Sequence, residues 1–102
     1  MAIRLTNLDA PGTPVKLKQG FEIAISAERL LGSGNGEVAL RCPDTRYSIS
    51  PSAVPISIPD GQNAVVTTVQ VMLEGPNPSS TIVVGIDGQA EDWHATSVTV
   101  TA

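Results

Sequence analysis

Few side chains in this sequence have the types and neighbours that covalent or acid–base chemistry requires. The 102 residues include one histidine, His94, and one cysteine, Cys42. A nucleophilic cysteine or serine needs a base that a carboxylate orients, and neither residue lies in a motif such as Gly-x-Ser-x-Gly. A single histidine also rules out a histidine-rich metal site. We therefore expect no enzyme activity, no catalytic residue and no cofactor, and we predict that Cys42 is a small buried residue.

Acidic residues are concentrated around one predicted loop near residue 90. Asp87 precedes this loop, and Glu91 and Asp92 lie in its last part. Carboxylate oxygens in loops are ligands that Ca²⁺ prefers, although the spacing here does not match an EF-hand. Acidic residues in turns also commonly accept hydrogen bonds from the local backbone. Asp87, Glu91 and Asp92 are therefore calcium candidates, and backbone bonding within the turn is the alternative.

Trp93 directly follows the acidic loop and is the side chain best suited to recognition. An exposed tryptophan can anchor a sugar or a protein partner, because it combines a large apolar area with one N–H donor. In a chain with so few aromatic residues, the sequence favours the alternative, a partly buried core residue. Carbohydrate-binding modules usually expose several aromatic side chains, whereas this chain has one each of Phe, Tyr and Trp. Further candidates for partner contact are Pro11, Pro14 and Arg4, because exposed strand edges invite pairing with a partner's strand.

The charge balance argues against two classes of partner. The net charge is −4, and the six Lys and Arg residues are scattered, whereas nucleic-acid binding needs a clustered basic surface. No segment approaches the run of about 20 apolar residues that spans a bilayer, and no apolar run of signal-peptide length follows Met1. We therefore expect neither nucleic acid nor membrane as a partner, and a protein made in the cytosol without a cleaved export signal.

The elements that must position these candidates show the apolar–polar alternation of half-buried β-strands. It is clearest in residues 21–27, 37–42, 63–74, 81–87 and 93–101. The 9 Gly and 8 Pro residues interrupt the chain often, and the one helical possibility is a short turn at residues 28–31. The sequence predicts a single all-β domain over residues 1–102, with about seven antiparallel strands in a β-sandwich or a barrel.

Three prolines, Pro51, Pro55 and Pro59, fall within one short segment that also contains Ile56 and Ile58. Proline has no backbone N–H to donate, so a segment rich in it is tolerated at a sheet edge and not in the middle of a sheet. We therefore predict that residues 50–59 form an edge, with the two isoleucines directed inward.

The same region carries a resemblance. The stretch from Tyr47 to Val66 combines a Ser- and Pro-rich strand, an apolar strand that ends in Pro59-Asp60-Gly61 and the start of a long Val/Thr strand. It resembles bacterial and phage immunoglobulin-like modules, and residues 96–101 look like their last strand. The resemblance covers about half of the chain and implies an immunoglobulin-like β-sandwich. The Cys…Trp…Cys signature of antibody domains is absent, and shared motifs of this structural kind specify fold better than function.

Three functions are consistent with these features. The first is a phage virion accessory subunit, such as a capsid decoration (cement) protein that binds the capsid or tail surface in many copies or as an oligomer. The second is an immunoglobulin-like module of a larger bacterial cell-surface or adhesive protein. The third is a carbohydrate-binding module. The resemblance favours the first, because phages assemble in the cytosol and carry such modules on capsids and tails, so we expect the protein in the virion.

Overall fold

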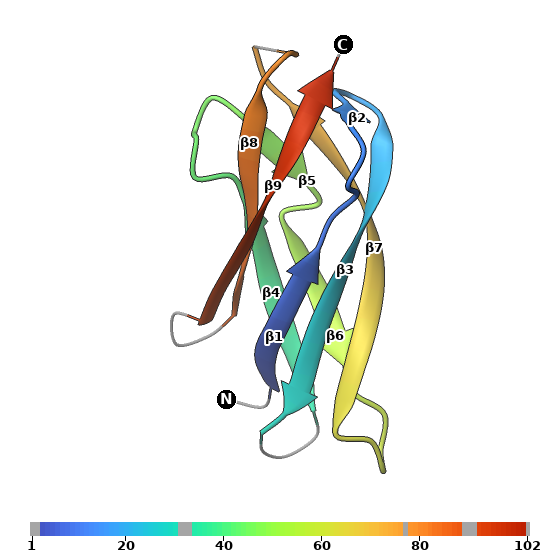
Figure 1. Ribbon diagram of the computed structural model, residues 1–102. Helices are drawn as coiled ribbons and strands as arrows, with labels where there is room; N and C mark the ends of the chain where they lie inside the picture. Colours follow the sequence, from blue (N-terminus) through green and yellow to red (C-terminus); the bar gives the residue numbers. More distant parts are fainter. Residues whose placement is uncertain (1–2, 31–33, 77, 89–91, 102) are drawn as a thin grey trace.

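The computed structural model describes residues 3–30, 34–76, 78–88 and 92–101, and these form strands without any helix (Figure 1). The all-β prediction is confirmed for this part of the chain. The strands are β1 (Ile3–Asp9), β2 (Val15–Lys16), β3 (Gly20–Arg29), β4 (Asn35–Arg41), β5 (Ser48–Ser50), β6 (Ala53–Ser57), β7 (Ala64–Glu74), β8 (Thr81–Gly88) and β9 (Asp92–Thr101).

The strands form two sheets that enclose the core between them (Figure 1). One sheet has four strands in the order β1-β3-β7-β5, and the other has five in the order β2-β9-β8-β4-β6. Neighbouring strands are antiparallel except for β2 and β9, which are parallel. The described residues thus form nine strands and not about seven, because the two- and three-residue segments β2 and β5 also pair.

The core follows from the alternation of apolar residues along each strand. Since successive side chains in a strand point to opposite faces, β7 directs Val71 and Leu73 inward, and the neighbouring β3 directs Ile23, Ile25 and Ala27 to the same side. In β1 the inward residues are Ile3, Leu5 and Leu8. The register shifts between Leu5 and Asn7, so Leu8 and not Asn7 is the next side chain that points inward. This shift is a β-bulge, in which one extra residue opposes a single residue of the partner strand. No polar or charged residue is buried among the described residues.

The edge predicted from the prolines is confirmed. β5 ends the four-stranded sheet and β6 ends the five-stranded sheet. The backbone N–H of Leu40 donates to the carbonyl of Ser52 (2.8 Å), and that of Ile58 donates to Gly34 (3.0 Å). Even-numbered residues of β6 therefore bond to β4, and Pro55 faces the open edge, where its missing N–H leaves no donor for another strand.

The short helical turn predicted at residues 28–31 is not formed in its described part. β3 continues through Arg29, whose guanidinium donates to the carbonyls of Ile58 (2.9 Å), Pro59 (3.0 Å) and Gln62 (3.1 Å). These bonds satisfy backbone carbonyls in the connection between β6 and β7. The physical reason for the difference is that Arg29 is held by a distant segment, a contact that local sequence does not encode.

A buried tyrosine joins two connections at the other end of the molecule. Tyr47, which is 4% exposed, lies just before β5, and its ring occupies the space above Gly75, the residue after β7. Its hydroxyl is 2.9 Å from the Oγ of Ser80. The phenol thereby fills the core while its polar end keeps a hydrogen-bond partner.

Candidate functional site

The most organised group of polar and aromatic side chains lies on the outer face of the five-stranded sheet, around Gly85. Gly85 is in the middle of β8, and its cross-strand neighbours are Arg41 on β4 and Ala95 on β9. A Cβ built on Gly85 would collide with Cη2, Cζ2 and Cζ3 of Trp93. The benzo edge of the indole therefore fills the space that the absent side chain leaves.

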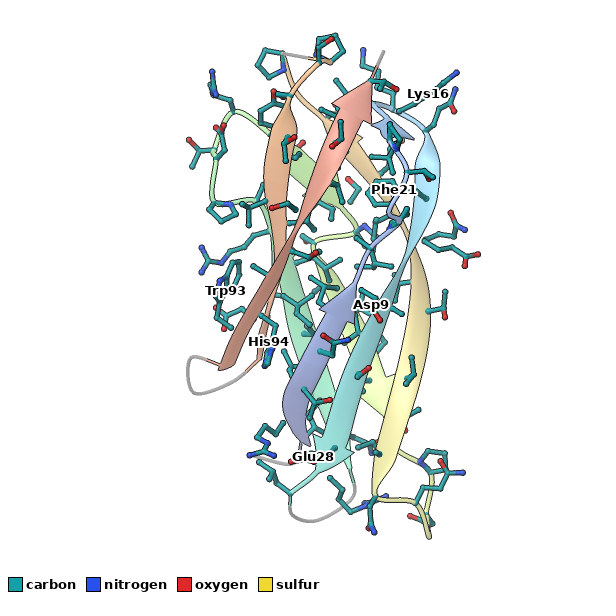
Figure 2. The ribbon with its side chains drawn as sticks, viewed as in Figure 1. Asp9, Lys16, Phe21, Glu28, Trp93 and His94 are labelled. Atoms are coloured by element: carbon teal, nitrogen blue, oxygen red, sulfur yellow. The ribbon has the colours of Figure 1, made fainter. Side chains whose placement is uncertain are left out.

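Trp93 reaches this position from β9, where it is paired with Asp87. Because Val98 and Val100 point inward along the same strand, Trp93 points outward, and Figure 2 shows its side chain outside the β8 and β9 ribbons. It is half-buried by its neighbours on this face. Trp93 is therefore a surface residue that packs on the sheet, and not a residue of the core between the sheets.

Arg41 covers the indole. Its Cζ lies 4.4 Å from the centre of the Trp93 ring, within the range of a cation–π contact. Its Nη2 is 3.8 Å from Oδ2 of Asp87, which is too long for a hydrogen bond. The Arg41 side chain is 58% exposed. Arg41, Gly85, Asp87 and Trp93 together form what we call the tryptophan cluster.

The guanidinium of Arg41 differs from the other three in this chain. Within the described residues it makes no hydrogen bond, and its contacts are the indole and the distant Asp87 carboxylate. The other arginines are all engaged: Arg4 with Glu28, Arg29 with three backbone carbonyls and Arg46 with Asp44. Arg41 thus presents N–H donors at the surface while the indole restricts its movement.

The three calcium candidates are only partly placed. Asp87 lies in β8 beside Arg41, and its Oδ1 is buried without a hydrogen-bond partner. Glu91 and the side chain of Asp92 lie outside the described residues. Among the residues that are described, no group of three or more His, Cys, Asp and Glu side chains could hold a metal ion. The carboxylate of Asp87 therefore has a guanidinium, and not a second described carboxylate, as its charged neighbour.

The other predicted contact residues lie away from the tryptophan cluster. Arg4, on β1, is paired with Glu28 of β3. It also lines an open hollow with Leu5, Thr6 and the half-buried His94.

Pro11 and Pro14 follow β1 in the connection to β2, the first half-buried and the second exposed. Trp93 instead packs against residues of β8 and β4. The structure thus places Trp93 beside Arg41, Gly85 and Asp87. It does not place Trp93 beside Arg4, Pro11 or Pro14.

Cys42 is buried, as the sequence indicated. Burial, and then the negative charge of Asp44, raises the pKa of its thiol. The thiol is therefore protonated at neutral pH. Since the nucleophilic form of cysteine is the thiolate, Cys42 is poorly suited to act as a nucleophile. Arg41 precedes it but points to the opposite face of β4, so it offers no cationic help.

The sequence identified Trp93 but missed Arg41 and Gly85 as its partners. A glycine in the interior of a strand pattern commonly marks the close approach of another group, and Gly85 between Val84 and Ile86 was such a signal. The identity of the approaching group depends on cross-strand register. Register is not readable from one sequence.

Comparison with known proteins adds no relative: no family model, no curated protein and no solved structure matches the chain significantly. Within the described residues, there is also no helix of the length and hydropathy needed to span a membrane.

Proposed function

We propose that the chain is a non-catalytic immunoglobulin-like sandwich that contacts a protein surface, as an accessory subunit of a phage virion such as a capsid decoration protein. The strand orders support the immunoglobulin-like assignment. Such domains place their first, second, fifth and fourth main strands in one sheet and the third, sixth and seventh in the other. Strands β1, β3, β7 and β5 correspond to the first set, and β4, β8 and β9 to the second.

The observation that carries the contact function is the outward placement of Trp93 with Arg41 beside it. The core is built almost wholly from aliphatic side chains, yet the single tryptophan of the chain is on the outside. Tryptophan and arginine are the residue types most enriched among those that dominate protein–protein binding energy. The tryptophan cluster is therefore the contact surface in this proposal.

Two observations bear on the alternatives. The ends of the described chain lie at opposite ends of the 43 Å long molecule (Figure 1), a placement that suits a module in a larger bacterial surface protein. That module is the second candidate. Sugar binding by Trp93 has less support, because the guanidinium of Arg41 lies against the ring on which a sugar would stack.

The test is whether the protein is part of virions made by the phage that encodes it. Purified virions are analysed by mass spectrometry, and purified protein is added to capsids that lack it and sedimented with them. We expect a fixed copy number per capsid and saturable co-sedimentation. Absence from virions, together with recovery from a bacterial cell-surface fraction, would contradict the virion assignment and support the second candidate.

A further inference from the structure

We infer that Arg41, supported by Trp93, is the anchor for a carboxylate on the partner protein. The inference rests on the proposed contact function and adds the chemistry that the partner must present. It starts from the contrast among the four arginines. The donors of Arg4, Arg29 and Arg46 are engaged within the chain, whereas those of Arg41 have no hydrogen-bond partner in the described part of the chain.

Arg41 lies over the Trp93 ring, and its N–H groups have no hydrogen-bond partner in the part of the chain that the structure describes. A guanidinium against an aromatic ring uses its face, while its N–H groups lie in its plane and point away. Two parallel N–H groups match the two oxygens of a carboxylate, and such bidentate pairs are the strongest common hydrogen bonds. The indole also limits the rotamers of Arg41, so less conformational entropy is lost when a partner binds.

The surroundings of Arg41 favour a protein partner. In the same row across the sheet lie Gly85, which the indole of Trp93 covers, and the exposed Ala95, whose small side chain leaves its part of the face low. Two residues before Gly85, Val83 is 40% exposed and is one of three large apolar side chains exposed among the described residues. A low face with apolar area beside a charged anchor is the composition of a protein contact site.

The net charge of the chain also favours a single carboxylate over a polyanion as the ligand of Arg41. The net charge of the chain is −4, which opposes the approach of a nucleic acid with its dense phosphates. A single carboxylate on a partner's loop meets this opposition far less. Among the side chains that the structure describes, Asp87 is the negative group paired with Arg41, and at 3.8 Å it weakens the site without occupying the donors. Removal of its charge should therefore strengthen carboxylate binding.

The experiment uses a short peptide with one central glutamate and the same peptide with glutamine, both blocked at their ends, at constant ionic strength. Binding is followed by the NMR signals of the Trp93 indole N–H and the Arg41 Nε–H. We expect the glutamate peptide to shift both signals saturably in the millimolar range, and the glutamine peptide to bind at least about tenfold more weakly. Inorganic phosphate is titrated in parallel, because only a carboxylate preference supports a protein partner.

Three variants make the test specific. Arg41→Gln should abolish the shift of the indole signal, and Asp87→Asn should lower the dissociation constant a few-fold. Arg46→Gln is the matched control, because Arg46 is equally an exposed arginine near an aromatic ring, with its donors held by Asp44. It should leave binding unchanged. Amide spectra establish that each variant is folded.

Several results would overturn the inference. These are equal binding of the two peptides, tighter binding of phosphate than of the glutamate peptide, no shift of either signal, or equal loss in the Arg41 and Arg46 variants. The proposed function is tested separately from the carboxylate anchor. If the wild-type protein binds capsids and Arg41→Gln binds them equally well, the contact function stands and the carboxylate anchor is wrong.

Discussion

The indole of Trp93 lies where the side chain of residue 85 would be if that residue were not glycine. The two residues are on adjacent antiparallel strands and are offset by two residues, since Trp93 is opposite Asp87 and Gly85 is opposite Ala95. This offset brings the ring to the middle strand and under the guanidinium of Arg41. The positions of Trp93 and Arg41 on the outer face therefore depend on the absence of a side chain at Gly85.

Replacement of Gly85 by alanine should displace the indole from the sheet. Because Trp93 is on the outer face, its ring can move into solvent, so we expect the free energy of unfolding to change by less than about 1 kcal/mol. The emission maximum of this single tryptophan should shift to longer wavelength. Gly12→Ala is the control, since nothing lies within 4 Å of a Cβ there. An unshifted emission spectrum would contradict the placement of the ring.

The corresponding change at Gly75 should cost far more. A Cβ on Gly75 would collide with Cγ, Cδ2 and Cε2 of Tyr47, which is buried and hydrogen-bonded to Ser80. Because the phenol ring is packed in the core, it must shift against its neighbours, so Gly75→Ala should lower the free energy of unfolding by about 3 kcal/mol. Urea denaturation with an unchanged m-value is the measurement. A loss equal to that of Gly85→Ala would show that Tyr47 is not confined.

Protonation of Asp44 in acid should weaken its hydrogen bonds with Arg46 in the turn that both residues form. Side-chain and backbone hydrogen bonds from Arg46 lower the pKa of the Asp44 carboxyl. A lowered folded-state pKa means that the contribution to stability is present above the unfolded value of about 3.9 and is lost as pH falls through the lower folded value. NMR titration of the carboxyl carbon should show this pKa rise toward the ordinary value in Arg46→Gln. An unchanged titration would mean that Arg46 does not bind Asp44 in solution.

The open edge at β6 gives a prediction about association. Pro55 faces this edge, where it removes the donor that another strand would need. Pro55→Val supplies that N–H together with a residue of high strand propensity. We expect concentration-dependent self-association of this variant in sedimentation velocity, under conditions in which Pro55→Gly, whose strand propensity is low, associates less. Identical sedimentation of the two variants would mean that the edge is blocked by other means.

Much of this fold was predictable because the local pattern and the final packing agree. The alternation in β7 and β8 fixed their inward faces, and the prolines placed β6 at an edge. The bulge after Leu5 and the two-residue pairing of β2 were not predictable, since both depend on which strand lies beside them. The candidate site likewise contains one residue that the sequence could indicate and one that it could not. Trp93 stands out by its type, whereas Arg41 acquires its position from a strand more than 40 residues earlier in the chain.

The parallel pairing of β2 with β9 has a mechanical consequence. Val15 and Lys16 pair with Val100 and Thr101, and Leu17 N–H donates to the carbonyl of Thr101 (3.1 Å). Since the chain ends leave at opposite ends of the molecule, tension between them would slide these two strands past each other. The bonds of this pair would then be loaded together and not one after another. If the molecule is stretched on a particle or a cell surface, tension from the N-terminal side reaches β1 and its pairing with β3 first. Once β1 has separated from β3, the β2–β9 pair carries the load, and its short length limits the force that it withstands.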